Sequence, residues 1–141
     1  MTPTTQTVTV PDGAVLHVEI HGTPSPAQPS LLFLQYYGGS PSTYALTLRQ
    51  PELDGVHSIL YHARGWAPST GPDDPAAYSI RAMSGDLAEI VCATGVDAHG
   101  GAGFILVGHS MGAKVAQHYA ATAKRRALKV CYCWRPRPCA D

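Results

Sequence analysis

The sequence predicts an α/β fold with a mostly parallel sheet. Three observations lead to this class: alternating stretches open the chain, continuous apolar runs follow at residues 31–34 and 104–107, and a stretch with helical features follows each run. Continuous apolar runs are typical of strands that are buried on both faces. Strands that alternate with helices build a mostly parallel sheet. With 141 residues, the chain has the length of one domain at most.

The first predicted element is a β-hairpin over residues 7–21. Apolar and polar residues alternate on both sides of Pro11-Asp12-Gly13, which is a typical turn sequence. The proline-rich residues 22–30 are expected to form a surface connection. The apolar run 31–34 then forms a buried strand that ends at a glycine-rich turn.

The middle of the chain predicts a helix, a strand and a second helix. A short helix is expected over residues 42–49, with Ser42 or its neighbour as the N-cap. Residues 57–61 are the next strand, and a loop rich in Gly and Pro follows it. Residues 79–93 carry apolar side chains near helical spacing, and Gly95 is a natural stop for this helix.

The last predicted elements are a buried strand over residues 104–107 and a helix from Ser110 to about Lys124. Beyond that point the sequence shows neither strand alternation nor helical spacing, and it has no predicted place in the fold. The strand at 104–107 is therefore expected at an open edge of the sheet. This predicts poor solubility, because unpaired apolar edges aggregate.

Composition excludes several classes of function. Ten basic and ten acidic residues cancel, so nothing points to nucleic acid or to an anionic membrane as a partner. No apolar run approaches the ~20 residues of a membrane helix. Residues 1–6 lack the basic and apolar regions of a secretory signal. We therefore expect a cytoplasmic protein, and the oligomeric state stays open.

The four cysteines do not predict a metal site. Cys92 is alone in a helical stretch, while Cys131, Cys133 and Cys139 are close together in the last residues. Their spacing matches none of the usual zinc patterns, and no histidine follows them. Gly101-Ala102-Gly103 precedes a strand rather than following one, so it is not a dinucleotide turn. We expect neither a metal nor a cofactor.

The strongest chemical signal is Gly108-His109-Ser110-Met111-Gly112, which joins a buried strand to a helix. A serine on such a tight strand-to-helix turn has a strained backbone, and side chains two residues away on either side would collide with the turn. Both positions therefore need glycine. The turn directs the Ser110 hydroxyl outward at the carboxyl end of the sheet, where open α/β sheets bind ligands.

The second signal is the glycine-rich turn Gln35-Tyr36-Tyr37-Gly38-Gly39-Ser40, which follows the strand at 31–34. The Asp12-Gly13 hairpin and the loop at 61–69 accompany the two signals. Together these pieces make residues 7–123 similar to the α/β-hydrolase fold superfamily, in its serine esterase-like branch and over its N-terminal half only. His62 and Ala67 depart from the family pattern Asp-x-Arg-Gly-x-Gly-x-Ser.

The resemblance implies a function and a set of site residues. Ser110 would be the catalytic nucleophile, Gly108 and Gly112 the glycines of its elbow, and the backbone N–H groups of Tyr37 and Met111 the oxyanion hole. Family members usually have His-Gly where this chain has Gln35-Tyr36, but a backbone donor needs no particular side chain. Serine at the elbow suits a small-molecule ester, lactone or similar acyl substrate, whereas the family's dehalogenases and epoxide hydrolases use aspartate there.

The remaining catalytic groups are not found in the sequence. The family order is Ser, then Asp or Glu, then His, but after Ser110 the only acid is Asp141 and the only histidine is His118. His109 is expected to pack, and His17, His21, His57, His62 and His99 are expected at the surface or in loops. We therefore expect a truncated hydrolase with weak or no activity. The alternative is a non-catalytic fragment or binding remnant.

The sequence divides into residues 1–123, the N-terminal half of an α/β-hydrolase domain, and residues 124–141, an aberrant tail. One permissible codon choice for residues 129–141, read two nucleotides later, encodes a Leu-rich strand and a proline turn that resemble the next strand of the family. A frameshift, an unremoved intron or a gene-model error is our hypothesis for this tail.

Overall fold

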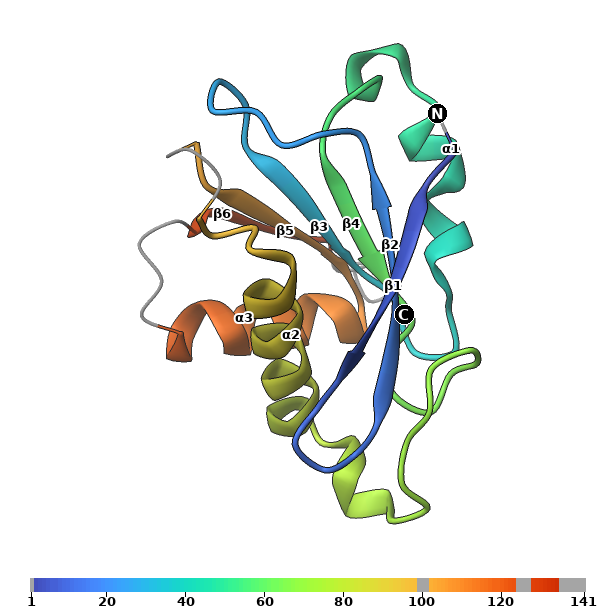
Figure 1. The fold of residues 1–141 in the computed structure, drawn as a ribbon. Coiled ribbons are helices and arrows are strands. Elements are labelled where there is room, and N and C mark those ends of the chain that lie inside the picture. The colour runs from blue at the N-terminus through green and yellow to red at the C-terminus, as the bar shows by residue number, and fades with distance from the viewer. Residues whose placement is uncertain (1, 99–101, 124–127, 135–141) are drawn as a thin grey trace, which may run out of the picture.

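The computed structural model describes residues 2–98, 102–123 and 128–134, the last range as backbone only. Within these ranges six strands form one sheet in the order β1-β2-β4-β3-β5-β6 (Figure 1). The strands are β1 (Thr4–Thr9), β2 (Val15–His21), β3 (Ser30–Leu34), β4 (Ser58–Tyr61), β5 (Phe104–His109) and β6 (Leu128–Trp134). The α-helices are α1 (Ala45–Leu48), α2 (Ile80–Thr94) and α3 (Met111–Thr122), and the 3₁₀ helices are η1 (Pro41–Tyr44), η2 (Pro51–Leu53) and η3 (Pro75–Tyr78).

The sheet is mixed, and its parallel part holds both apolar runs. β1 pairs with β2 and β2 with β4 in antiparallel fashion, which confirms the predicted hairpin and starts it at Thr4. β4, β3, β5 and β6 are parallel neighbours. The α/β class is therefore confirmed. β3 and β5 lie side by side, so the segments that follow them meet at one end of the sheet.

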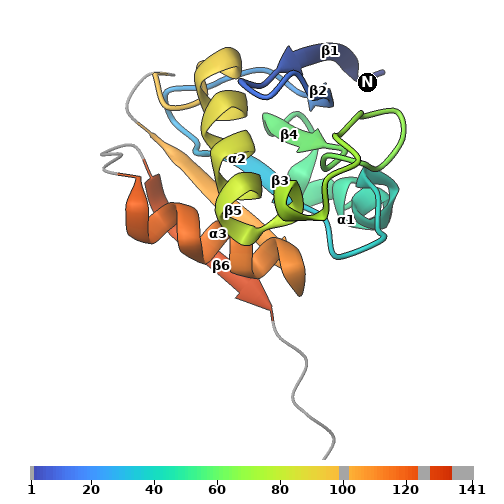
Figure 2. The same cartoon turned by 90° about the horizontal axis from the view of Figure 1, so that it is seen from below.

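The helices form two layers around the sheet (Figure 2). α2 and α3 pack side by side on one face, and α1 lies on the other. The main core lies between the sheet and α2, whose apolar stripe is buried as its spacing predicted. The fully buried residues of this core include Leu16, Leu32, Leu87, Ile90, Phe104 and Leu106.

The ends of α2 are set by local side-chain and glycine chemistry. The Ser79 hydroxyl accepts a hydrogen bond from the Ala82 N–H at 3.2 Å, as an N-cap does. At the other end Gly95 has φ 63° and donates its N–H to the Cys92 carbonyl at 3.2 Å. A left-handed residue at this place favours glycine. The predicted helix and its stop are confirmed.

The predicted helix at 42–49 begins differently. Pro41 opens the 3₁₀ turn η1, and α1 continues it for only four residues. Ser42 is not the cap: Ser40 holds that position, and its hydroxyl bonds the Ser42 hydroxyl at 2.6 Å rather than a backbone N–H. Proline favours the first helical position because its φ is already fixed and it lacks the N–H that would stay unbonded there.

The expectation for the end of the chain is wrong at residues 128–134. This segment forms β6, which pairs with β5 in parallel from Phe104↔Leu128 to His109↔Trp134. β5 therefore has a partner on both sides and is not an open edge, so the reason for expecting poor solubility is removed. Val130, Tyr132 and Trp134 alternate and have high β propensity, a signal that the basic and cysteine-rich neighbours obscured. The origin of residues 124–141 stays a hypothesis.

No helix within the described residues is both long enough and apolar enough to span a bilayer.

Candidate functional site

Ser110 lies directly between β5 and α3, with no linking residue on either side. Its backbone has φ 53° and ψ −113°, and among the described residues it is the one non-glycine residue with positive φ. L-residues rarely adopt this conformation, and it stores about 1–3 kcal/mol of strain. The residue is exposed. The turn therefore holds a strained serine at the carboxyl end of a central strand.

The two glycines that flank Ser110 have no room for a side chain. A Cβ on Gly108 would lie 2.7 Å from the backbone nitrogen of Ala113. A Cβ on Gly112 would overlap the Leu34 carbonyl oxygen and lie 2.6 Å from that of Gln35. Because these neighbours are backbone atoms, no rotamer change can relieve the overlap. The close approach also brings the start of α3 against the end of β3.

The turn after β3 leaves a backbone amide without an internal partner. The Gly39 N–H donates to the Tyr36 carbonyl at 2.9 Å, and Gly38 has φ 74°, so Tyr37 lies at the outer corner of a tight turn. Its side chain is 74 % exposed. Within residues 2–98 and 102–123 neither the Tyr37 N–H nor the Met111 N–H donates a hydrogen bond. Both amides are available to a ligand.

Tyr44 fixes the end of β3 from the other face of the sheet. Its hydroxyl donates a 2.7 Å hydrogen bond to the Leu34 carbonyl, the same group that contacts Gly112. The ring packs on Phe33 with centroids 4.8 Å apart. Burial raises the pKa of Tyr44 to about 12, so its hydroxyl stays a donor at neutral pH. The backbone under the Tyr37 turn is therefore held on both sides.

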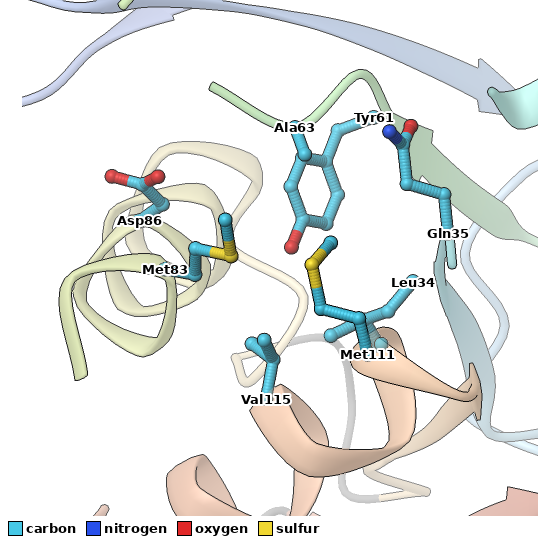
Figure 3. A pocket seen from close by; sticks show the side chains of 9 residues that line it. Leu34, Gln35, Tyr61, Ala63, Met83, Asp86, Met111 and Val115 are labelled. Atoms are coloured by element: carbon cyan, nitrogen blue, oxygen red, sulfur yellow. The ribbon is translucent and has the colours of Figure 1, made fainter. Parts of the chain in front are cut away.

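A small cavity lies beneath Met111 (Figure 3). It encloses about 10 Å³, room for about one water molecule. The Tyr61 ring points between Met83 and Met111, while the Asp86 carboxylate points away. Gln35 also lines the cavity: it is 3 % exposed, and its amide has no hydrogen-bond partner among the described residues. The cavity is too small for a substrate.

A buried ion pair joins the loop after β4 to α2. Arg64 donates to the Asp86 carboxylate from Nε at 2.7 Å and from Nη2 at 2.5 Å, and the two residues are 3 % and 2 % exposed. Arg64 Nη1 also donates to Asp12 at 2.7 Å and to the Ala77 carbonyl at 2.9 Å. The hydrogen bonds that Arg64 donates to the Asp86 carboxylate raise the pKa of Arg64. Burial raises the pKa of Asp86, and Arg64 opposes this shift. The two short parallel hydrogen bonds have the geometry of a bidentate guanidinium–carboxylate pair.

An open cleft of about 530 Å³ lies beside the strained turn. Tyr37 and Met111 line it, so the residues whose amides are free border this cleft. Trp66 and Tyr78 form another part of its wall. The volume lies within the range of small-molecule sites. The cleft borders the Ser110 turn through Met111 and has room for a small molecule, whereas the small cavity does not.

The described histidines make their contacts with groups other than the Ser110 hydroxyl. His109 packs edge-on against Tyr36 with centroids 5.5 Å apart, and His118 lines a groove between α2 and α3. Contrary to expectation, His57 is buried and bonds the Ser30 hydroxyl at 2.8 Å, because its loop packs under the start of β3. His17, His21 and His62 are half-buried, and His99 lies outside the described residues. In the part of the chain that the structure describes, no histidine bonds the Ser110 hydroxyl.

No group of metal-ligating side chains forms a metal site among the residues whose side chains are described. Cys131, Cys133 and Cys139 lie outside that set, so the structure does not test the prediction from their spacing.

Two groups of site residues were missed in the sequence. Asp86 falls on the apolar stripe of α2, between Met83 and Ile90, and a charge on a buried face signals a buried partner. The cleft residues Trp66, Asp73 and Tyr78 lie between β4 and α2. The loop at 61–69 contributed to the family resemblance, but these residues were not singled out as a binding wall. The aromatic content of this segment was the available signal.

A strained serine between a central parallel strand and a helix, flanked by glycines that backbone atoms enclose, defines the α/β-hydrolase class of folds. The comparison with protein families agrees: the family described as "alpha/beta hydrolase fold" matches residues 29–131. The chain belongs to this family.

The relatives have different activities in their names. The chain is 32 % identical over 97 residues to the "Putative carbamate hydrolase RutD" of Agrobacterium fabrum. The matched region covers 69 % of this chain and 34 % of that protein. It superimposes on a structure described as a putative aryl esterase from Burkholderia cenocepacia with a TM-score of 0.77 and 30 % identity, covering 89 % of this chain and 44 % of the other. A Vigna radiata epoxide hydrolase mutant shares the fold, with a TM-score of 0.77 at 22 % identity over 93 % of this chain and 38 % of its own.

The chain spans about a third of the length of the curated relative and less than half of the length of the matched structures.

Proposed function

We propose that the chain carries the nucleophile of a serine hydrolase that acts on a small-molecule ester, lactone or similar acyl substrate. The observation that carries this proposal is the backbone of Ser110, at φ 53° between β5 and α3, with Gly108 and Gly112 closed in by backbone atoms. Such strain persists only where the surrounding structure enforces it, and it concentrates at functional sites.

The proposed first step is an attack on the acyl carbon. The Ser110 oxygen forms a bond to the carbonyl carbon, and the carbonyl electron pair moves onto its oxygen. The N–H groups of Tyr37 and Met111 hold that oxyanion, each contributing ~3 kcal/mol of transition-state stabilisation. The oxyanion then re-forms the carbonyl as the bond between the acyl carbon and the alcohol oxygen breaks, and the alcohol leaves with the proton that the Ser110 hydroxyl gave up. Water adds to the acyl carbon in the same way, so that the acid leaves and Ser110 regains its proton. The N-terminus of α3 favours the developing negative charge.

Serine at position 110 favours acyl chemistry over epoxide opening. The matched structures include both a protein named for esters and one named for epoxides, and the fold similarity does not separate them. An acyl-enzyme requires an alcohol or thiol nucleophile, which Ser110 supplies. The names of two relatives with at least 30 % identity both refer to substrates with an acyl carbon.

A second candidate is a non-catalytic chain. Among the described residues the Ser110 hydroxyl bonds neither a histidine nor a carboxylate. A serine hydrolase that lacks its triad partners loses on the order of a millionfold in turnover. We therefore propose that the 141-residue chain acylates slowly and that full turnover needs an acid and a histidine that follow Ser110 in the family order.

The test is acylation of the purified chain by excess p-nitrophenyl acetate, followed by peptide mass spectrometry. We expect an acetyl adduct of about 42 Da to accumulate on the Ser110 peptide faster than on other serine peptides, a mass fixed by the chemistry of acetylation. Ser110→Ala removes this adduct, and Ser42→Ala, at an exposed serine of η1, leaves it unchanged. Equal labelling of Ser42 and Ser110 would show that the turn does not activate its serine, and would favour the non-catalytic chain.

A further inference from the structure

The open cleft beside Ser110 has three aromatic walls that stand nearly at right angles. The rings of Tyr37 and Trp66 have centroids 5.3 Å apart and an interplanar angle of 82°. Those of Trp66 and Tyr78 are 6.4 Å apart at 73°. Met83 and Met111 line the same cleft. A group bound here contacts polarisable rings and thioethers from several directions.

Tyr78 is held in place before any ligand binds. Its hydroxyl donates a 2.9 Å hydrogen bond to the Pro72 carbonyl. A Cβ on Gly65 would lie 2.6 Å from the Tyr78 ring, and one on Gly71 would lie 2.5 Å from its hydroxyl. Two glycines therefore make room for this ring. Because the hydroxyl is already bonded, Tyr78 offers the cleft its ring.

The charged side chain among the described residues that line the cleft is negative. Asp73, an exposed carboxylate between Pro72 and Pro75, lines the cleft, and no lysine or arginine is among the described residues that line it. Aromatic rings carry negative charge on their faces. Rings and carboxylate together attract a cation and repel an anion. Aromatic cages of this kind bind quaternary ammonium groups.

We propose that this cleft binds the ammonium group of an organic cation, so that the acyl substrate of Ser110 carries a quaternary or tertiary ammonium group. The statement about the substrate rests on the proposed function. The statement about binding does not, because the cleft residues make their contacts whether or not Ser110 reacts.

The direct test compares two molecules of nearly equal shape. Choline carries the trimethylammonium group, and 3,3-dimethyl-1-butanol is its neutral counterpart. Trp66 and Trp134 are the two tryptophans of the chain, so Trp134→Phe leaves Trp66 as the only fluorescent indole. We expect choline to change this fluorescence saturably and to bind about fivefold more tightly than the neutral alcohol. Calorimetry on the unmodified chain gives the same ratio should the variant fail to fold.

Two pairs of variants locate the binding. Asp73→Asn is expected to weaken choline about threefold without affecting the alcohol, since a solvent-exposed charge contributes less than about 1 kcal/mol. Glu52→Gln, at an exposed acid of η2 outside the cleft, changes neither ligand. Tyr37→Leu weakens choline severalfold, and Tyr37→Phe, which keeps the ring, retains it.

The outcomes separate this inference from the proposed function. If choline binds both the unmodified chain and Ser110→Ala, and the unmodified chain is not acylated at Ser110, the cation site is supported and the proposed hydrolase function is overturned. Acylation at Ser110 without any preference for choline over the alcohol keeps the hydrolase and overturns the cation site. Equal binding of the two ligands would identify a purely apolar cleft, and no saturable binding of either would also overturn the inference.

Discussion

Arg64 and Asp86 face each other through two parallel hydrogen bonds of 2.7 and 2.5 Å in a place that water does not reach. The same guanidinium bonds Asp12 in the turn of the first hairpin. One side chain therefore connects three segments: the β1–β2 turn, the loop after β4 and the middle of α2. This loop also carries the aromatic wall of the cleft.

Breaking this pair from one side should destabilise the fold strongly. Arg64→Met leaves the Asp86 charge buried without its partner, and we expect a loss of about 3–5 kcal/mol in the free energy of unfolding. The double variant Arg64→Met with Asp86→Leu removes both charges and should recover most of that loss. Urea denaturation gives both numbers.

Arg49→Met serves as the matched control, because Arg49 is exposed and has no ion pair among the described residues. Its stability should stay within about 0.5 kcal/mol of the unmodified chain. A double variant that is no more stable than Arg64→Met alone would mean that shape, rather than charge, determines this contact.

Asp12 makes stability depend on pH in the acid range. The Ala14 N–H and then the Arg64 guanidinium lower the pKa of the Asp12 carboxyl. A carboxyl with a lowered folded pKa stabilises the fold above its unfolded pKa of about 4, and this contribution is lost as pH falls through the folded pKa. Asp12→Asn should therefore be less stable than the unmodified chain at about pH 6, and the difference should shrink toward about pH 2.5.

Urea denaturation at several pH values measures this difference. The same series on Asp54→Asn, an exposed acid without an ion pair in the described ranges, should give a smaller difference with less change across pH. A difference for Asp12→Asn that grows on acidification would contradict the expected sign.

Two glycine-to-alanine changes should have opposite effects. At Gly112 the new methyl group meets the carbonyl oxygens of Leu34 and Gln35, and we expect a loss of about 3 kcal/mol. At Gly85, exposed in the middle of α2, nothing lies within 4 Å of the new Cβ. Alanine there should stabilise the chain by about 1 kcal/mol, because glycine is a poor helix former. The melting temperatures of both variants, compared with that of the unmodified chain, test these two expectations. A Gly112→Ala variant as stable as the unmodified chain would show that β3 and α3 can separate at little cost.

Replacing Ser110 by glycine should stabilise the protein. Glycine accepts φ 53° because it has no Cβ, so the substitution releases part of the backbone strain. Glycine also raises the entropy of the unfolded chain, which opposes this effect. We expect a net increase of about 1 kcal/mol in the free energy of unfolding. Ser110→Ala keeps a Cβ in the same conformation and should stay near the unmodified chain. The melting temperatures of the two variants test this. If the glycine variant melts no higher than the alanine variant, the turn is not strained.

The sequence predicted those elements whose signal is local. The alternation around Pro11-Asp12-Gly13, the helical spacing at 79–93 with the Gly95 stop, and the run at 104–107 each depend on neighbouring residues, and each element formed in its predicted place. The requirement for Gly108 is local as well, because a Cβ there would meet Gly112 and Ala113. The requirement for Gly112 is not local, because the atoms that exclude a side chain there are the carbonyl oxygens of Leu34 and Gln35 at the end of β3.

Features that depend on distant partners were not predictable in the same way. β6 pairs along the backbone edge of β5, and the alternation of Val130, Tyr132 and Trp134 does not by itself show which strand it joins. The cleft combines Tyr37, from the turn after β3, with Trp66 and Tyr78, which lie about 30 and 40 residues later. Only the sheet order places these side chains together.

The contact of Gly112 with the end of β3 has a consequence for how this site can change. Because Gly112 has no gap to the end of β3, we expect a displacement of the Ser110 turn to be transmitted to the Tyr37 turn. Leu34 and Gln35 are 1 % and 3 % exposed, yet substitutions there would alter the spacing between the Ser110 hydroxyl and the Tyr37 amide. In a mutational library these two interior positions should therefore behave like residues in direct contact with the ligand.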